Sequence, residues 1–170
     1  MKTMLKTDAR LCNNSEYTNI EASYIEATTL IERLHRRLLD LIEDDIQRRG
    51  VSDINAVQAL LLFNIGDQEL SAGELRKRGY YLGSNVSYNL KKLVDLGYLN
   101  QQASRADRRS VRIMLTEKGS EIRDDVAALY DRCMGRIEPV GGISAEDFIN
   151  LNKTLARLDR FWTDHIMYRL

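Results

Sequence analysis

Residues 16–49 form a long stretch that contains neither glycine nor proline. Both residue types interrupt helices, so their absence permits one continuous helix. Apolar side chains recur here at steps of three, four and seven residues, the spacing of one helix face: Tyr24, Ile31, Leu34, Leu38, Leu41, Ile42 and Ile46. The stretch therefore predicts a long amphipathic helix that ends at Gly50, preceded by a disordered tail over residues 1–15.

The rest of the chain predicts shorter helices and one hairpin. Pro139 is the only proline among 170 residues, which favours helices over most of the length. The expected elements are helices over 55–65, 72–78 and 84–96, strands over 98–102 and 110–115, and two long helices after residues 116 and 144. Residues suited to cap these helices precede them: Ser52 or Asp53, Ser71, Ser84, Thr116 and Ser144.

This order of elements predicts a mainly α fold with a small β-wing. Three short helices followed by a hairpin are typical of a winged helix-turn-helix domain, which is expected over residues 50–115. N- and C-terminal dimerisation helices are expected to flank this domain, over residues 16–49 and 116–170.

The charges of the chain are unevenly distributed. There are 25 basic and 25 acidic side chains, so the net charge is zero. Residues 71–115, however, hold nine basic and only three acidic side chains, and the remainder of the chain is correspondingly acidic. A basic centre of this kind is the electrostatic footprint of a polyanion-binding site. A solvated surface with patchy charge is the alternative.

The helix over 84–96 carries the groups expected of a DNA-reading helix. Its apolar residues share one face: Val86, Leu90, Leu93 and Val94. Hydroxyl, amide, phenol and ammonium groups occupy the other face and its flank, where they can bond base edges and phosphates. An arginine-rich hairpin tip follows, and an arginine on a thin ribbon can enter a narrow minor groove. The predicted DNA contacts are Ser84, Asn85, Ser87, Tyr88, Lys91, Lys92, Arg105, Arg108 and Arg109.

Asp107 lies among the arginines of the hairpin tip. Its carboxylate can pair with Arg109 or cap the turn, and either role would fix the shape of the wing. Successive residues of a hairpin point to opposite sides, so Arg108 would not take part in this pairing. Its side chain is therefore the better candidate to enter a minor groove or bind a phosphate. An exposed hairpin whose charges discourage edge pairing is the alternative.

Two runs of the sequence resemble a known family. The segment from Asp107 to Gly119 has an Asp-x-Arg wing and then a strand that ends Leu-Thr-x-x-Gly. The run from Leu93 to Leu99 is similar to the exit of the recognition helix in the same family. Together they resemble the MarR family of winged-helix transcription regulators.

The resemblance implies an obligate homodimer in which the first and last helices interleave and two wings straddle a pseudo-palindrome in double-stranded DNA. It supports the pairing of Asp107 with Arg109. It also implies that a small apolar or aromatic effector controls the protein, which is predicted to be a repressor that the effector releases. Residues 80–89 are similar to the alphaproteobacterial LdtR-type branch, whose members are tied to L,D-transpeptidase expression.

Two further sets of residues are predicted, one for dimerisation and one for effector binding. A heptad-like stripe in the last helix, with two residues of the first, is too apolar for the surface of a small monomer and predicts the dimer interface: Tyr24, Ile31, Phe148, Leu151, Leu155, Leu158 and Trp162. The effector pocket is expected where the first, second and fifth helices meet the winged domain: Arg37, Leu38, Ile42, Leu61, Phe63, Val126 and Tyr130. Each of these pocket residues could equally belong to the core.

Other classes of protein find less support in the sequence. No P-loop, GxGxxG or HExxH pattern occurs, so an enzyme, a metal site and a bound cofactor are not expected. Cys12 and Cys133 have no metal-site or disulfide spacing, and a redox-sensing regulator switched through either thiol is one alternative. A dimeric scaffold without DNA binding is another. The sequence shows no signal peptide and no membrane-spanning run, which predicts a cytoplasmic protein.

Overall fold

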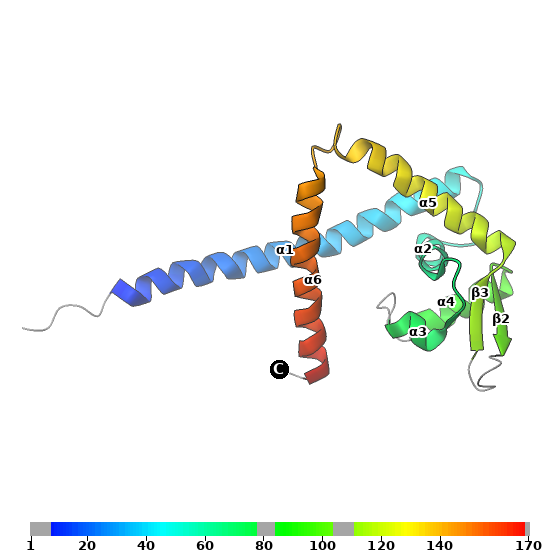
Figure 1. The fold of residues 1–170 in the computed structure, drawn as a ribbon, viewed down its shortest axis with the longest axis horizontal. Helices are drawn as coiled ribbons and strands as arrows, with labels where there is room; N and C mark the ends of the chain where they lie inside the picture. The colour runs from blue at the N-terminus through cyan, green and yellow to red at the C-terminus, as the bar shows by residue number, and fades with distance from the viewer. Residues whose placement is uncertain (1–7, 78–83, 104–110, 169–170) are drawn as a thin grey trace, which may run out of the picture. The chain divides into compact units, whose positions relative to one another are not determined.

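The computed structural model describes residues 8–77, 84–103 and 111–168. The chain forms two compact units, Met1–Arg123 and Asp124–Leu170. Helix α1, Asp8–Arg48, belongs to the first unit and runs out beyond its other elements (Figure 1). The helix begins before the predicted start at Glu16, so residues 8–15 of the expected tail are helical. Good helix formers such as Ala9, Arg10 and Leu11 account for the difference, since no glycine or proline separates them from the rest of α1.

The C-terminal end of α1 matches the prediction. Arg48 is its last residue, and Gly50 takes φ +83°, a left-handed conformation that glycine adopts without a steric penalty. The N–H of Val51 closes the end by donating to the carbonyl of Ile46. Among the described side chains of α1, Ile42 and Ile46 are buried, and this end of the helix packs against α2, Ala56–Ile65.

Helix α2 is buried nearly all round, as its apolar sequence predicts. The predicted caps Ser52 and Asp53 are wrong, because Asn55 is the N-cap. The side chain of Asn55 accepts from the N–H of Gln58, and the side chain of Gln58 accepts from the N–H of Asn55. This reciprocal pair satisfies N–H groups that the start of a helix leaves without partners. The buried residues of α2 are Ala56, Gln58, Ala59, Leu61, Leu62 and Ile65.

Two short helices complete the helix-turn-helix part of the first unit. Helix α3 spans Ala72–Lys77, and its predicted cap is confirmed because the N–H of Glu74 donates to the hydroxyl of Ser71. Helix α4 spans Ser84–Asp95. It ends one residue before the predicted Leu96, and Gly97, which was expected to stop it, takes φ +77°. The next residue, Tyr98, donates its N–H back to the carbonyl of Leu93.

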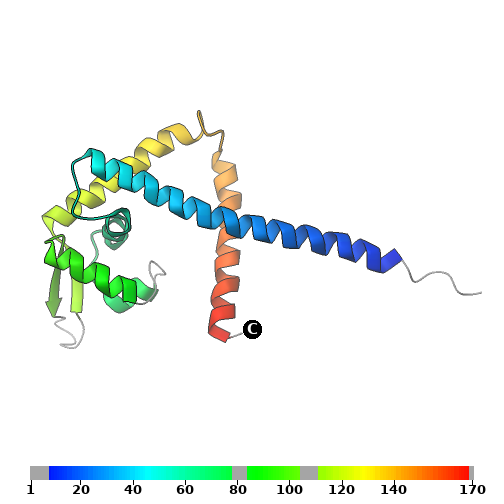
Figure 2. The ribbon, with the colours of Figure 1, turned by 180° about the vertical axis from the view of Figure 1, so that it is seen from behind.

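The sheet has three antiparallel strands in the order β1-β3-β2. Strands β2, Leu99–Ala103, and β3, Val111–Leu115, form the predicted hairpin, with Leu99 opposite Leu115. The hairpin projects to one side of helices α2 to α4 in both views (Figures 1 and 2). Strand β1, Leu70–Ser71, is absent from the sequence prediction, because two residues are too few to show the alternation of a strand.

Two long helices follow the hairpin. Helix α5 spans Glu117–Ile137 and α6 spans Ala145–Tyr168, and their predicted caps, Thr116 and Ser144, are confirmed by hydrogen bonds from Gly119 and Asp147. The boundary between the two units lies inside α5, after Arg123, and this residue forms an ion pair with Asp67 within the first unit. No helix in the described part of the chain combines the length and apolar character needed to cross a membrane.

Candidate DNA-binding surface

Helix α4 has an apolar inner face and a polar outer face. Leu90 and Leu93 are 3% and 0% exposed, whereas Tyr88 is 67% exposed. At about 100° per residue, Tyr88 lies almost opposite the two leucines. The inner face packs against β2, so the helix cannot turn its polar residues inward. The described members of the predicted DNA-contact set on α4 are Ser87, Tyr88 and Lys91, which are exposed, and Lys92, which is half-buried.

Other predicted contact residues lie outside the described part of the chain. The side chains of Ser84 and Asn85 are among them, as are four wing residues: Arg105, Asp107, Arg108 and Arg109. What the structure describes is the base of the wing, the paired strands β2 and β3. The proposed pairing of Asp107 with Arg109 therefore stays a prediction.

An ion pair anchors the wing base to α3. The guanidinium of Arg112 on β3 donates to the carboxylate of Glu74 at 2.9 Å. The same carboxylate oxygen accepts from the N–H of Ser71, at 2.7 Å. Arg112 is one of the nine basic residues of the predicted basic centre, and the structure gives it this local partner. The Ser-x-x-Glu spacing of a capping box indicates the bonds between Ser71 and Glu74, but nothing in the sequence indicates that Glu74 also pairs with Arg112.

Hydrogen bonds from Thr116 hold the segment between β3 and α5 against the start of β2. Thr116 donates its N–H to the carbonyl of Tyr98 and its hydroxyl to the carbonyl of Gly97, at 3.1 and 2.7 Å. A Cβ atom on Gly119 would lie only 2.2 Å from the carbonyl oxygen of Tyr98. The Leu-Thr-x-x-Gly pattern thus has a physical reason, since the threonine bridges two carbonyls and the glycine leaves room for one of them.

A second cluster, missed by the sequence interpretation, joins three segments of the first unit. The hydroxyl of Tyr98 donates to one carboxylate oxygen of Asp53 at 2.7 Å, and the ammonium of Lys118 donates to the other at 3.0 Å. The same ammonium lies 3.8 Å from the centre of the Tyr98 ring. The cluster ties the loop after α1 to the start of β2 and to the first turn of α5.

The three groups of this cluster shift one another's protonation. The hydrogen bond from Tyr98, aided by Lys118, lowers the pKa of Asp53 below its ordinary value. Burial, followed by the bond to Asp53, raises the pKa of Tyr98. The carboxylate of Asp53 raises the pKa of Lys118. Each shift favours the charged carboxylate, the neutral phenol and the charged ammonium that the geometry requires.

The cluster is expected to stabilise the fold at neutral pH and to lose that effect in acid. Because the pKa of Asp53 is lower in the folded state, its contribution is present above the pKa of the unfolded chain and is lost as the pH falls through the folded-state pKa. Asp53→Asn should lower the free energy of unfolding by about 1 kcal/mol at pH 7. Urea unfolding at several pH values should show this difference shrinking below about pH 4. Tyr98→Phe, which removes only the hydroxyl, should weaken the same pH dependence, and a constant difference down to pH 2 would contradict the assignment.

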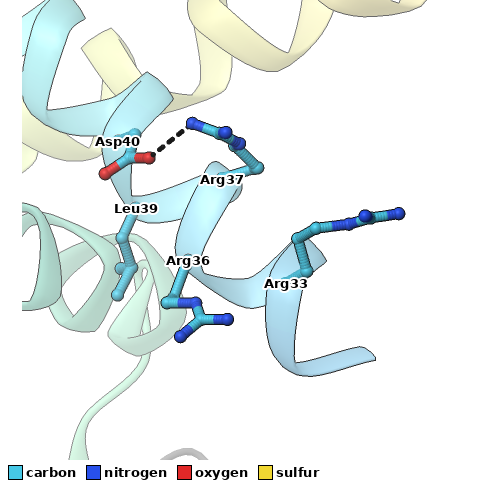
Figure 3. Close-up of a pocket in the computed structure, with 5 residues that line it drawn as sticks. All are labelled: Arg33, Arg36, Arg37, Leu39 and Asp40. Carbon is cyan, nitrogen blue, oxygen red and sulfur yellow. Dashed lines mark hydrogen bonds and ion pairs between the residues drawn. The ribbon is translucent and has the colours of Figure 1, made fainter. Parts of the chain in front are cut away.

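A cavity of about 430 Å³ lies beside α1. Figure 3 shows its three arginines along the helix, with Arg37 turned toward Asp40, whose carboxylate lies 3.4 Å from its guanidinium. The lining residues are Arg33, Arg36, Arg37, Leu39 and Asp40. Among the residues that the structure describes, no group of three or more His, Cys, Asp or Glu has an arrangement that could hold a metal ion.

The residues predicted for the pocket and the dimer interface have varied surroundings. Arg37 lines the cavity, whereas Ile42, Leu61 and Val126 are each at most 1% exposed. Leu38, Phe63 and Tyr130 are half-buried. On α6, Phe148, Leu151 and Leu155 are exposed. The remaining predicted interface residues are Tyr24, which is exposed, and Ile31, Leu158 and Trp162, which are half-buried.

Comparison with known proteins places this surface in a family. Residues 54–119 match the family described as a winged helix DNA-binding domain. The exopolysaccharide II synthesis transcriptional activator ExpG of Rhizobium meliloti (strain 1021) is 38% identical over 149 residues, which are 86% of this chain and 75% of that protein. These matches are to transcription regulators and not to enzymes.

Solved structures show the same fold. A cysteine-to-serine mutant of MarR from E. coli, complexed with operator DNA, aligns with a TM-score of 0.64 at 20% identity over 80% of this chain and 95% of that one. BpsR of Bordetella bronchiseptica, solved in a study of how 6-hydroxynicotinic acid regulates its DNA binding, aligns with a TM-score of 0.61 at 18% identity over 79% and 98%. With the winged helix-turn-helix described above and 38% identity across three quarters of a transcription regulator, the chain belongs to the MarR family of winged helix-turn-helix transcription regulators.

Proposed function

We propose that this DNA-binding regulator binds a pseudo-palindromic DNA duplex as a homodimer. The observation that carries the proposal is the two-faced α4, with Leu90 and Leu93 anchored in the core and Tyr88 and Lys91 directed outward. A helix held in this way offers a phenol and an ammonium group to the edges and backbone of a major groove. The excess of basic residues over 71–115 supports the same proposal.

The proposed contacts divide into base-reading and backbone-binding groups. Polar side chains in the first half of α4 read base edges, because their hydroxyl, amide and phenol groups can distinguish donors from acceptors: Ser84, Asn85, Ser87 and Tyr88. Ammonium and guanidinium groups of α4 and the wing hold phosphates or enter the minor groove: Lys91, Lys92, Arg105, Arg108 and Arg109. Asp107 pairs with Arg109 and stiffens the wing.

Substitutions in the two groups are expected to have different signatures. Tyr88→Ala should relax the preference at particular base pairs, at a cost of about 1–3 kcal/mol. Arg108→Ala should weaken binding to all duplexes and lower the salt slope by about one per wing, because it removes a phosphate-type contact. Selection from a random DNA pool identifies the operator, and affinities are then measured for the operator and a scrambled duplex at two salt concentrations. The assignment would be wrong if Arg108→Ala changed the base preference and Tyr88→Ala changed only the salt slope. The wing would then read the bases, and α4 would bind the backbone.

The dimer proposal rests on the apolar face of α6. No described residue of this helix is buried in the single chain, although apolar residues follow a heptad-like spacing along it. A helix with an apolar stripe gains stability only when that stripe is covered. The 3-4 spacing is typical of a helix-to-helix seam, so we assign a second copy of this chain as the partner. The exposed residues of the stripe are Phe148, Leu151 and Leu155.

We further propose that the effector is a small aromatic acid that binds in the cavity beside α1. The lining carries three guanidinium groups, from Arg33, Arg36 and Arg37, and Leu39 offers an apolar surface. Arg36 pairs with Glu32 and Arg37 with Asp40 in the structure, so a bound carboxylate would replace these two exposed ion pairs, each of which contributes little stability. Arg37 belongs to the predicted pocket set. A comparable chemistry is named for BpsR, whose DNA binding is regulated by 6-hydroxynicotinic acid, an aromatic carboxylic acid.

Such an acid is expected to lower operator affinity by about 5- to 150-fold, the range of most coupling between sites. The probe is 6-hydroxynicotinate, and the control is the corresponding amide, which lacks the carboxylate. Arg37→Gln should blunt the effect of the acid and leave operator affinity without ligand unchanged. Fluorescence anisotropy with the labelled operator measures both. Equal effects of the acid and the amide would show that the arginines do not hold the ligand.

The effect on transcription is proposed to be repression, through an operator that overlaps the promoter and is freed by the effector. ExpG is named as an activator, so activation is the other outcome. The position of the operator relative to the promoter decides between repression and activation. Switching by oxidation of the half-buried Cys133 or of Cys12 is the competing regulation. A peroxide response that survives in Cys133→Ser would remove Cys133 from that alternative.

A further inference from the structure

A buried amide connects the first helix of the helix-turn-helix pair to α4. Gln58 on α2 is 1% exposed and, apart from the phenol of Tyr98, is the only buried polar side chain in the described part of the chain. Its Nε2 group donates to the Oδ1 of Asn89 on α4, at 3.0 Å. Its Oε1 accepts from the N–H of Asn55 at 3.1 Å. Both ends of one amide are therefore used, one to cap α2 and the other to hold α4.

The burial of this amide makes the bond difficult to exchange for water. Gln58 is 1% exposed, and the residues next to it and one turn further along α2, Ala59 and Leu62, are completely buried. An amide left without a partner in such an apolar setting costs about 1–3 kcal/mol. The bond between Gln58 and Asn89 is thus costly to break from the side of Gln58, and it links α2 directly to α4.

The position of Asn89 on α4 gives the bond a directional role. The residue is half-buried, at the border between the inner face with Leu90 and the outer face with Tyr88. Apolar contacts such as those of Leu90 tolerate a small rotation of the helix about its axis, because they have no preferred direction. A hydrogen bond at the border does not tolerate it, since its length and angle change as the helix rolls.

We propose that Gln58 is a positioning residue for DNA recognition, which acts by fixing the roll of α4 through Asn89. The proposal rests on the proposed function, in which the outward face of α4 reads base edges. A roll of the helix would move Tyr88 and Ser87 relative to the groove and would weaken the discrimination between bases. Gln58 itself is too deeply buried to touch DNA.

The test measures the ratio of affinities for the selected operator and a scrambled duplex. Gln58→Met keeps the length of the side chain and removes the amide, and it is expected to lower this ratio about tenfold. Asn89→Ala should lower it equally, and the double variant should lower it no further, because both substitutions remove the same bond. The ratio is insensitive to a loss of folded protein, which reduces both affinities together.

Two control variants separate positioning from other roles. Asn55→Ala removes the side-chain cap of α2 but leaves the Gln58–Asn89 bond, so it should lower the thermal midpoint and preserve the ratio. Asn89→Asp keeps an acceptor oxygen for Gln58, so it should lower both affinities through its negative charge and also preserve the ratio. A ratio lost in Asn89→Asp would mean that Asn89 reads DNA itself, which would overturn the proposal.

The remaining outcomes distinguish this proposal from the proposed function. A wild-type protein that prefers no DNA sequence would overturn both. A wild-type preference that survives in Gln58→Met and in Asn89→Ala would overturn only the positioning role. Additive losses in the double variant would show that the two residues act separately and would also reject it.

Discussion

Leu155→Asp is expected to separate the proposed dimer into monomers and to reduce operator affinity by about 10²- to 10⁴-fold. The reduction follows because two linked half-site contacts raise the overall affinity by about that factor. Leu155 is 37% exposed in the single chain and α6 has no buried described residue, so the aspartate removes no core packing. It instead places a charge inside the proposed seam, where burial without a partner is unfavourable.

Light scattering measures the mass of the variant, and anisotropy compares a full operator with a half-site. Affinity for the half-site should change little, because α4 and the wing are intact in each monomer. Lys153→Asp introduces the same side chain on the opposite face of α6 and should leave both the mass and the operator affinity nearly unchanged. A folded wild-type monomer, or equal effects of the two substitutions, would refute the assignment of α6 to the interface.

Gly119→Ala is expected to lower the free energy of unfolding by about 3 kcal/mol. The new Cβ would lie 2.2 Å from the carbonyl oxygen of Tyr98, and a backbone atom cannot turn aside as a flexible side chain can. The carbonyl is also the acceptor for Thr116, so its displacement would weaken the link between β2 and the start of α5.

The matched control is Gly135→Ala in the same helix, where nothing beyond the neighbouring residues and the local helix backbone lies within 4 Å of the Cβ position. That substitution should stabilise the protein by up to about 1 kcal/mol, through the higher helix propensity of alanine. Urea unfolding of both variants measures the difference. If both substitutions raised the free energy of unfolding, the contact between the new Cβ and Tyr98 would be relieved at little cost and the prediction would be wrong.

Much of the fold was predictable, because the signals that control it are local. The absence of glycine and proline before Gly50, the capping residues Ser71, Thr116 and Ser144, and the apolar face of α4 all act within a few residues of the chain. They predicted the order of helices, the hairpin and the outward direction of Tyr88. The Leu-Thr-x-x-Gly pattern indicated the family.

The sequence prediction was wrong or incomplete at three places, the N-cap of α2, strand β1 and the start of α1. Ser52, Asp53 and Asn55 are all suitable helix caps, and only the reciprocal bonding with Gln58 selects Asn55. Strand β1 is formed by Leu70 and Ser71 because β3 lies beside them, and two residues carry no alternation of their own. The early start of α1 shows that a polar sequence without helix breakers can still be helical.

Side-chain partners far apart in the chain depended on tertiary structure. The residues that meet Asp53 lie 45 and 65 positions away, at Tyr98 and Lys118. The partner of Gln58 lies 31 positions away, at Asn89. No periodicity links such positions, because the packing of the elements brings them together. The sequence alone determined the helices, the hairpin and the outward face of α4, since propensity, capping and periodicity are short-range properties. Which buried polar groups hold α4 and the wing in place was decided only by the tertiary structure, because a hydrogen bond forms only where packing brings donor and acceptor within about 3 Å.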